Sequence, residues 1–129
     1  MAPSKISSAV EVIFFCDHRG QSPVIEWLRE SDDFTQAKAG QRFRVLAREG
    51  HALNRPLAEH VEGDIYALRI KSSSKRQFRI FYFFHHRTMA ILTHGFLKAS
   101  DKIPLSEIER AKKSRELFIS GPDRYTYKR

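Results

Sequence analysis

The chain has 129 residues, of which 41% are hydrophobic and 12% aromatic, and its formal net charge is +8 at pH 7. This length suits one domain with a modest core, and the composition argues against a disordered chain. Cys16 is the single cysteine, so an internal disulfide and a cysteine metal site are both excluded.

A strand and a short helix are predicted first. Val10–Cys16 reads VEVIFFC, a β-branched and aromatic run typical of a strand buried on both faces, and we expect it to pair with later strands. After a loop, Ser22 can cap a helix that has Pro23 at its first position. This helix should end near Ser31.

A longer helix is predicted over residues 34–49, where apolar side chains recur at helical spacing. Gly50 is its expected C-terminal stop, and Gly40 in its middle costs about 1 kcal/mol relative to alanine. Residues 51–63 contain Pro56, and their apolar residues recur at neither helical nor strand spacing. We expect them to form a connection without a strand.

Residues 64–100 read DIYALRIKSSSKRQFRIFYFFHHRTMAILTHGFLKAS, which predicts three antiparallel strands joined by turns at SSSK and HHR. Pro104 then opens a third helix that should end near Ile119. The order is β, α, α, β, β, β, α, which predicts a small α+β domain with its helices on one face of a twisted sheet. We expect one domain over residues 1–120 and a loose basic tail over residues 121–129.

The positive charge is concentrated on this three-stranded segment. From Tyr66 to Lys98 there is no Asp or Glu, whereas residues 1–65 hold eight basic and ten acidic residues. Seven cations lie in the segment: Arg69, Lys71, Lys75, Arg76, Arg79, Arg87 and Lys98. A field of one sign on one rigid element indicates a polyanionic partner, with nucleic acid first and an acidic protein second.

Strand alternation predicts which cations share a face. With Leu68 and Ile70 under the helices, Arg69 and Lys71 fall on the open face of the first of the three strands. Arg79 falls there on the second strand if its Tyr82 side packs inward. Phe81 and Phe83 would then accompany Arg79, either as core or as rings that stack on bases; the sequence favours neither. On the third strand, the residues of one parity are Leu92, His94, Phe96 and Lys98.

Three motifs together carry a resemblance. DIYALRI, then QFRIFYFF, then HGFLKASDKIP with the following EIERAKK helix resemble the RelE/HigB superfamily of bacterial toxins, in particular its phage-derived HigB-like branch. The similarity runs from Val12 to Ile119. It implies a microbial RNase-like fold, an endonuclease that cuts mRNA, usually on the ribosome, and a cognate antitoxin, expected as a helix-turn-helix protein.

The resemblance implies that basic residues on the open sheet face carry the activity. By motif these are Arg69 in ALRI, Arg79 in QFRI and Lys98 in GFLK, with Lys71 a weaker match. We expect Arg79 to stabilise the phosphate in the transition state, Arg69 to hold the RNA backbone and Lys98 to transfer a proton. Lys75, Arg76, Phe81 and Tyr82 are further expected RNA contacts.

The proton-transfer group that some relatives place after the last strand has no counterpart in DKIPLSEIER. His94 is therefore a candidate acid and Tyr82 a weaker one. A single histidine in a strand is more often a packed side chain than a catalytic group. Because the 2′-hydroxyl of RNA is itself the nucleophile, we expect no metal and no cofactor.

Two other functions stay open. Related ParE-like proteins inhibit DNA gyrase without cutting RNA, and they generally lack the basic set found here. A plain nucleic-acid-binding module is the second alternative. Signal-peptide and membrane-span patterns are missing from the sequence, so we expect a cytoplasmic protein without a membrane partner.

Overall fold

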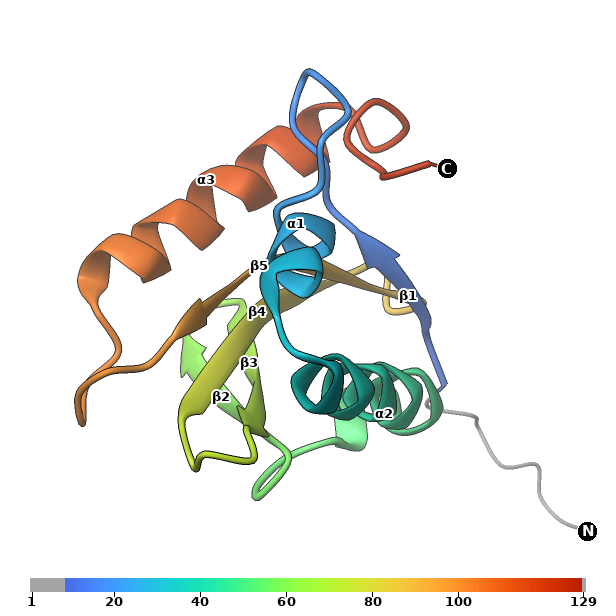
Figure 1. Ribbon diagram of the computed structural model, residues 1–129. Helices are drawn as coiled ribbons and strands as arrows, with labels where there is room; N and C mark the ends of the chain where they lie inside the picture. Colours follow the sequence, from blue (N-terminus) through green and yellow to red (C-terminus); the bar gives the residue numbers. More distant parts are fainter. Residues whose placement is uncertain (1–8, 129) are drawn as a thin grey trace, which may run out of the picture.

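The computed structural model describes residues 9–128. Three helices and one mixed five-stranded sheet form a small α+β fold (Figure 1), and this architecture is compatible with a RelE-like fold. The elements are β1 (Glu11–Phe14), α1 (Pro23–Glu30), α2 (Asp33–Glu49), η1 (Gly50–Ala52), β2 (Ala58–Glu62), β3 (Ile65–Lys71), β4 (Gln77–His85), β5 (Met89–Leu97) and α3 (Leu105–Ser120). The expectation of no signal peptide falls partly on residues 1–8, outside this description.

The helices begin and end close to the predicted residues. Ser22 caps α1 by accepting a hydrogen bond from the N–H of Ile25, and Asp32 caps α2 by accepting one from Thr35 at 2.8 Å. Gly50 ends α2 with a φ of 52°, a conformation in which glycine avoids the steric cost of a side chain. The predictions for all three helices are confirmed.

The three-stranded prediction is also confirmed, but the sheet has one more strand. The order is β1-β5-β4-β3-β2, with β3, β4 and β5 antiparallel and β1 parallel to β5. The prediction of a strandless connection over residues 51–63 is wrong, because β2 pairs with β3 through a turn at Gly63 and Asp64. Gly63 has a φ of 55°, as such a tight turn favours.

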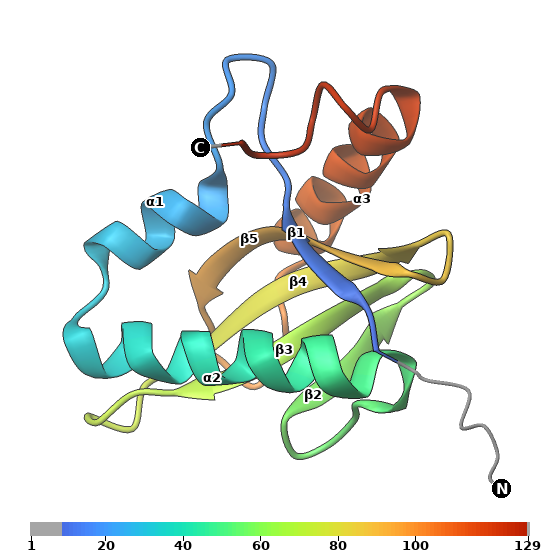
Figure 2. The same ribbon diagram turned by 90° about the vertical axis from the view of Figure 1, so that its right-hand side faces the viewer.

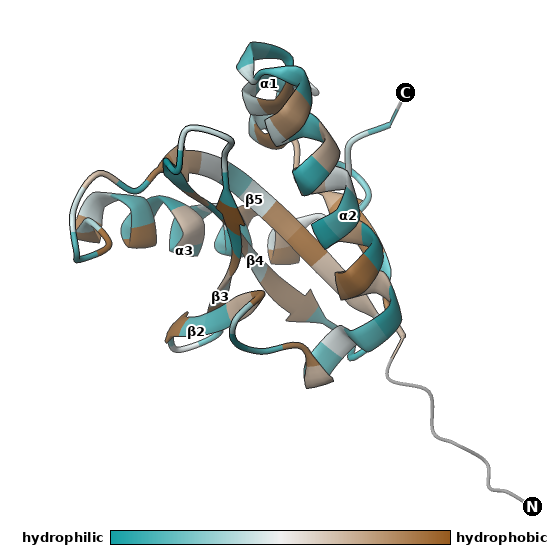
Figure 3. Cartoon of the chain, turned by 60° about the horizontal axis from the view of Figure 1, so that its bottom comes forward, coloured by the Kyte–Doolittle hydropathy of each residue, from teal (hydrophilic) through white to brown (hydrophobic). Residues whose placement is uncertain are grey.

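Both faces of the sheet are covered. The helices α1 and α2 pack on a face built around Leu68, Ile80 and Tyr82, and α3 packs on the other face (Figure 2). The expectation of all helices on one face is therefore wrong. The reason is that β4 carries apolar side chains on both faces, so helices must shield both faces from water. The brown colouring of the central strands in Figure 3 illustrates this apolar character.

An irregularity in β5 changes which of its side chains share a face. Phe81 pairs with His94 but Tyr82 pairs with Leu92, so Thr93 is an extra residue at this point. Leu92 therefore packs under α1 and α2, while Phe96 belongs to the core under α3. The prediction that one face of the sheet holds Leu92, His94, Phe96 and Lys98 is therefore wrong.

The segment after α3 packs against β1. Tyr125 is buried and stacks on Phe15, and Thr126 forms a β-bridge with Phe15. The tail is therefore not loose between residues 121 and 128, and residue 129 lies outside the description. This segment covers the outer edge of β1, which explains why Phe15 and Cys16 are buried at the edge of the sheet. No helix among residues 9–128 is long and apolar enough to cross a membrane.

Candidate functional site

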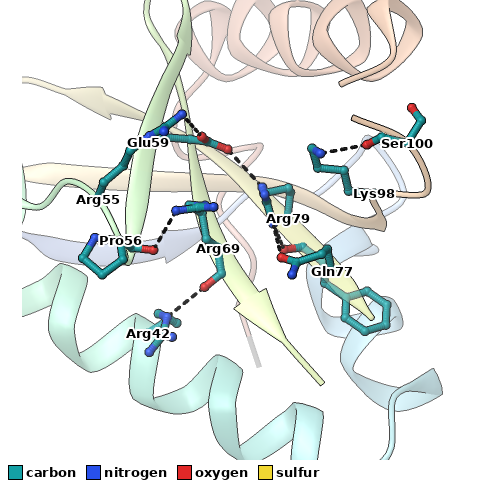
Figure 4. A network of polar contacts seen from close by, with 10 residues as sticks. Arg42, Arg55, Pro56, Glu59, Arg69, Gln77, Arg79, Lys98 and Ser100 are labelled. Atoms are coloured by element: carbon teal, nitrogen blue, oxygen red, sulfur yellow. Dashed lines mark hydrogen bonds and ion pairs between the residues drawn. The ribbon is translucent and has the colours of Figure 1, made fainter. Parts of the chain in front are cut away.

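A depression of about 440 Å³ lies over β2, β3 and β4, beside the segment that leads into α3. It brings together Arg69, Arg79 and Lys98, the three cations that the sequence placed on the open face (Figure 4). The three come from β3, from β4 and from the residue that follows β5. Because α3 covers the farther part of this face, the depression is what remains accessible of the predicted open surface.

Arg79 is almost fully buried, at 3% exposure, and is held by three acceptors. Its Nε donates to Oε2 of Glu59 at 3.0 Å, and its Nη1 donates to the carbonyl of Phe78 at 3.0 Å and to the Gln77 side chain at 3.3 Å. Burial lowers the pKa of the Arg79 guanidinium, and Glu59 opposes this shift. The guanidinium is thus fixed in position before any ligand arrives.

Arg69 is the direct cross-strand partner of Arg79. Two like charges opposite each other in a sheet are destabilising, so their pairing indicates a requirement other than stability. Arg69 donates from Nη1 to the carbonyl of Pro56 at 3.2 Å, while its buried Nε has no partner among the described residues. Arg42 of α2 donates to the Arg69 carbonyl at 2.9 Å and ties the strand to the helix.

Lys98 lies at the rim of the same depression. Its backbone N–H donates to the Gln77 carbonyl at 2.8 Å, which continues the pairing of β5 with β4. Its Nζ donates to the Ser100 carbonyl at 2.7 Å and is only partly exposed. The three cations therefore differ in exposure, since Arg79 is buried whereas Arg69 and Lys98 are partly exposed.

The remaining predicted RNA contacts do not all reach this site. Lys71, Lys75 and Arg76 are exposed at and around the β3–β4 turn. Phe81 and Tyr82 are fully buried, on opposite faces of the sheet. The expected contacts of these two rings with RNA do not fit the structure, because helices cover both of them.

His94 and Tyr82 are not placed to act as acids in the depression. His94 is 1% exposed, with Nε2 hydrogen-bonded to Glu107 at 2.9 Å and Nδ1 to Thr93 at 3.0 Å. Burial lowers its pKa to about 3, so the ring is neutral at pH 7. Burial likewise raises the pKa of Tyr82, whose hydroxyl has no partner among the described residues. The packed-side-chain interpretation of His94 describes what is found.

Glu59 is the site residue that the sequence analysis missed. Its carboxylate accepts hydrogen bonds from Arg79 and, at 3.0 Å, from Arg55, and its side chain is 11% exposed. The signal for its strand was the Gly63-Asp64 pair, which follows an alternating AEHVE and precedes an apolar run, as in a hairpin. Regular alternation from that pair would have set Glu59 opposite Leu68, on the other face. The register shift between His60 and Glu62 instead pairs Glu59 with Ala67, on the face of Arg69 and Arg79, and the sequence carries no signal for this shift.

Comparison with protein families matches residues 26–116 to a family of phage-derived Gp49-like proteins (DUF891). This match covers well over half of the chain and includes β2 to β5 and most of α3. The chain belongs to this family. Gp49-like proteins are associated with toxins of the RelE/HigB type. Comparison with curated proteins gives no match.

Proposed function

We propose that this Gp49-like protein is the toxin of a toxin-antitoxin module and cuts mRNA, on the translating ribosome, without a metal ion. One observation carries the proposal: Arg69, Arg79 and Lys98 converge in a single depression. Two guanidinium groups and one ammonium match the phosphates of an RNA backbone, and the depression also contains a carboxylate.

RNA cleavage by the 2′-hydroxyl requires three catalytic contributions from the protein. The 2′-hydroxyl attacks the adjacent phosphorus, so its proton must be accepted, the added negative charge stabilised and the leaving 5′-oxygen protonated. Arg79 stabilises the charge, because a guanidinium keeps its proton and offers a planar fork of donors. Arg69, directly opposite Arg79, holds the neighbouring part of the backbone.

Glu59 and Lys98 take the two proton transfers. A phosphate that binds Arg79 competes with the Glu59 carboxylate, which is then released beside the 2′-hydroxyl and accepts its proton. Lys98 can give a proton to the 5′-oxygen and recover it from water, which Arg79 does not do at neutral pH. This assignment fills the proton-transfer role that His94 and Tyr82 leave open.

A cognate antitoxin, expected as a helix-turn-helix protein, would control this activity. The partner would have to cover or distort the depression, and an acidic segment suits its five cations, which are Arg55, Arg69, Arg79, Lys98 and Lys102. The ribosome, rather than free RNA, is the proposed place of cleavage, since the family resemblance implies it.

The test is to induce the chain alone in growing bacteria and to map new 5′ ends across translated messages. We expect growth arrest and cuts at a fixed position in the codon frame. Arg79→Ala should reduce cutting about 100-fold or more, the cost of removing one transition-state donor. Arg48→Ala is the matched control, because Arg48 is exposed, on α2 and paired with Glu49.

Two results would replace the proposal. Growth arrest without new 5′ ends would favour a ParE-like inhibitor of DNA gyrase, and no arrest with salt-sensitive RNA binding would favour a binding module. Equal cutting by the Arg79→Ala variant and by wild type would remove the depression from the mechanism.

A further inference from the structure

A second cavity, of about 370 Å³, lies between the α1–α2 junction and the β3–β4 turn, which meet at one end of the sheet (Figure 2). Its walls combine two aromatic rings, one guanidinium, two carboxylates and hydroxyls. The rings belong to Trp27 and Phe78, the guanidinium to Arg76 and the carboxylates to Glu30 and Asp32, and Ser72 supplies one of the hydroxyls. Its volume is within the range of small-ligand sites.

The aromatic wall is rigid. The ring of Trp27 packs on Gly95 so closely that a β-carbon there would lie 2.8 Å from Trp27 Cδ2. Trp27 also meets the Phe78 ring edge-on at 5.5 Å between centroids. Arg76 extends over Phe78, 5.8 Å from its ring centre. The two rings stand at 67° to each other, so with the guanidinium they form a corner in which a nucleobase can stack on one ring and meet the other edge-on.

The opposite side of the cavity is acidic. The Glu30 carboxylate has no hydrogen-bond or ion-pair partner among residues 9–128. Asp32 accepts the N–H of Thr35, and this bond lowers the pKa of the Asp32 carboxyl. Both carboxyl groups carry oxygens that can accept hydrogen bonds from a ligand. Ser72, which is buried, adds a hydroxyl at the floor.

This donor and acceptor pattern selects among ligands. Two carboxylates repel a phosphate, and Arg76 disfavours a lysine or arginine side chain. Guanine presents the acceptors O6 and N7 on one edge, which suit an arginine, and the donors N1–H and N2–H on another, which suit a carboxylate. Adenine and uracil lack the paired donors that would satisfy Glu30.

The cavity is next to the proposed cleavage site. Phe78 and Arg79 are successive residues of β4 and point to opposite faces of the sheet. Arg79 Nη1 also donates to the Phe78 carbonyl at 3.0 Å. An RNA strand that crosses this end of the sheet can therefore place a phosphate on Arg79 and a neighbouring base beside Phe78.

We propose that this cavity binds a guanine base of the RNA, with Trp27 and Phe78 as the stacking wall, Arg76 on O6 and N7, and Glu30 on N1–H and N2–H. The inference rests on the proposed function for the identity of its ligand as RNA. It assigns base selection to the α1–α2 junction and phosphate chemistry to the depression on the other face.

Trp27 is the single tryptophan of the chain, so its fluorescence reports on this cavity and on a neighbouring one of about 300 Å³ that Trp27 also lines with Glu26. The experiment titrates the full chain with GMP, IMP and AMP, which share a phosphate and differ in the base. We expect a saturable fluorescence change with GMP, at a dissociation constant about tenfold below those of IMP and AMP. IMP lacks only the 2-amino group, so it isolates the contact with Glu30.

Glu30→Gln should abolish the preference for GMP over IMP, because an amide cannot accept both donors. Glu26→Gln, on the same helix and outside this cavity, should leave the preference intact. Equal affinity for the three nucleotides, or no change in Trp27 fluorescence, would overturn the inference.

This readout needs no cleavage, so the two proposals fail separately. A preference for GMP in a chain that cuts no message would overturn the proposed function alone. Cutting without any preference for GMP would overturn only the guanine site. Arg79→Ala should retain the GMP preference while it loses cutting.

Discussion

Glu59 occupies, on Arg79, the position that a phosphate oxygen would take: its Oε2 accepts from Arg79 Nε at 3.0 Å, and both side chains are nearly buried. Its second oxygen binds Arg55 at 3.0 Å. The free protein thus balances its central guanidinium with its own carboxylate. Under the proposed function, RNA binding would exchange one anion for another, which would limit the gain in affinity from Arg79.

Glu59→Gln tests this exchange. The amide keeps the shape and an acceptor oxygen but removes the competing charge, so we expect about fivefold tighter binding of a non-cleavable RNA, equivalent to about 1 kcal/mol. The cleavage rate should fall about 100-fold or more, because the amide cannot accept the 2′-hydroxyl proton. Fluorescence anisotropy and single-turnover cleavage measure the two effects.

Glu62→Gln is the control, because Glu62 is on the same strand but pairs with Lys112 of α3 outside the depression. It should change neither quantity. Unchanged cleavage in the Glu59→Gln variant would eliminate Glu59 as the proton acceptor.

Two glycine substitutions should have opposite effects on stability. Gly95→Ala would place a β-carbon 2.8 Å from the Trp27 ring, and we expect the free energy of unfolding to fall by about 1–3 kcal/mol. Gly40→Ala puts its β-carbon 3.6 Å from Arg44 in the middle of α2, an ordinary contact, and should raise it by about 1 kcal/mol. Urea titrations followed by Trp27 fluorescence compare them; equal changes would contradict the close packing of Trp27 on Gly95.

Tyr82→Phe should be neutral or stabilising, by up to about 1 kcal/mol. The Tyr82 hydroxyl is buried without a partner among the described residues, and an unsatisfied buried hydroxyl costs free energy. Tyr66→Phe, on the ring stacked against Tyr82, should change stability by less than about 0.5 kcal/mol. A loss of more than about 1 kcal/mol in Tyr82→Phe alone would mean that the hydroxyl has a bonding partner.

Stability should fall in acid because of His94. Its pKa is about 3 in the folded state, mainly through burial and secondarily through Arg110, against an ordinary 6.5. Below pH 6.5 the unfolded chain therefore binds a proton that the folded chain refuses until about pH 3. The free energy of unfolding should decline across this window by up to about 1.4 kcal/mol per pH unit.

His94→Gln should remove this part of the pH dependence, whereas His60→Gln, at an exposed position, should not. Glu107, which accepts from His94 in the neutral state, is present in both variants. An NMR titration in which the His94 ring gains a proton near pH 6.5 in the folded protein would contradict the prediction.

Local signals in the sequence predicted most of the fold. Ser22 and Gly50 lie at helix ends because the Ser22 side chain and the Gly50 backbone suit those positions. The apolar alternation from Ile65 to Lys98 predicted the three central strands. The alternation of β3 and β4 also placed Arg69 and Arg79 together on one face.

What the sequence could not give depends on contacts between distant segments. The position of α3 on the second face follows from packing against Phe81 and Phe83, which had two acceptable environments in the sequence. The extra residue Thr93 breaks the alternation of side chains along β5. The face of His94, and its burial beside Glu107, therefore could not be predicted from strand alternation. The ion pair of Glu59 with Arg79 joins residues 20 positions apart and needed the missed strand β2.

The direct opposition of Arg69 and Arg79 has a consequence for laboratory evolution. Like charges on neighbouring strands lower the stability of the sheet, so replacing Arg69 with an apolar residue should relieve repulsion. Replacing Arg79 would instead leave the nearly buried Glu59 carboxylate without one of its two cations. A library selected only for heat resistance would therefore be expected to lose Arg69 early and to keep Arg79. Such survivors would lack one of the proposed RNA contacts, and they would provide a folded form of the chain for raising antibodies or for testing whether the proposed antitoxin binds it.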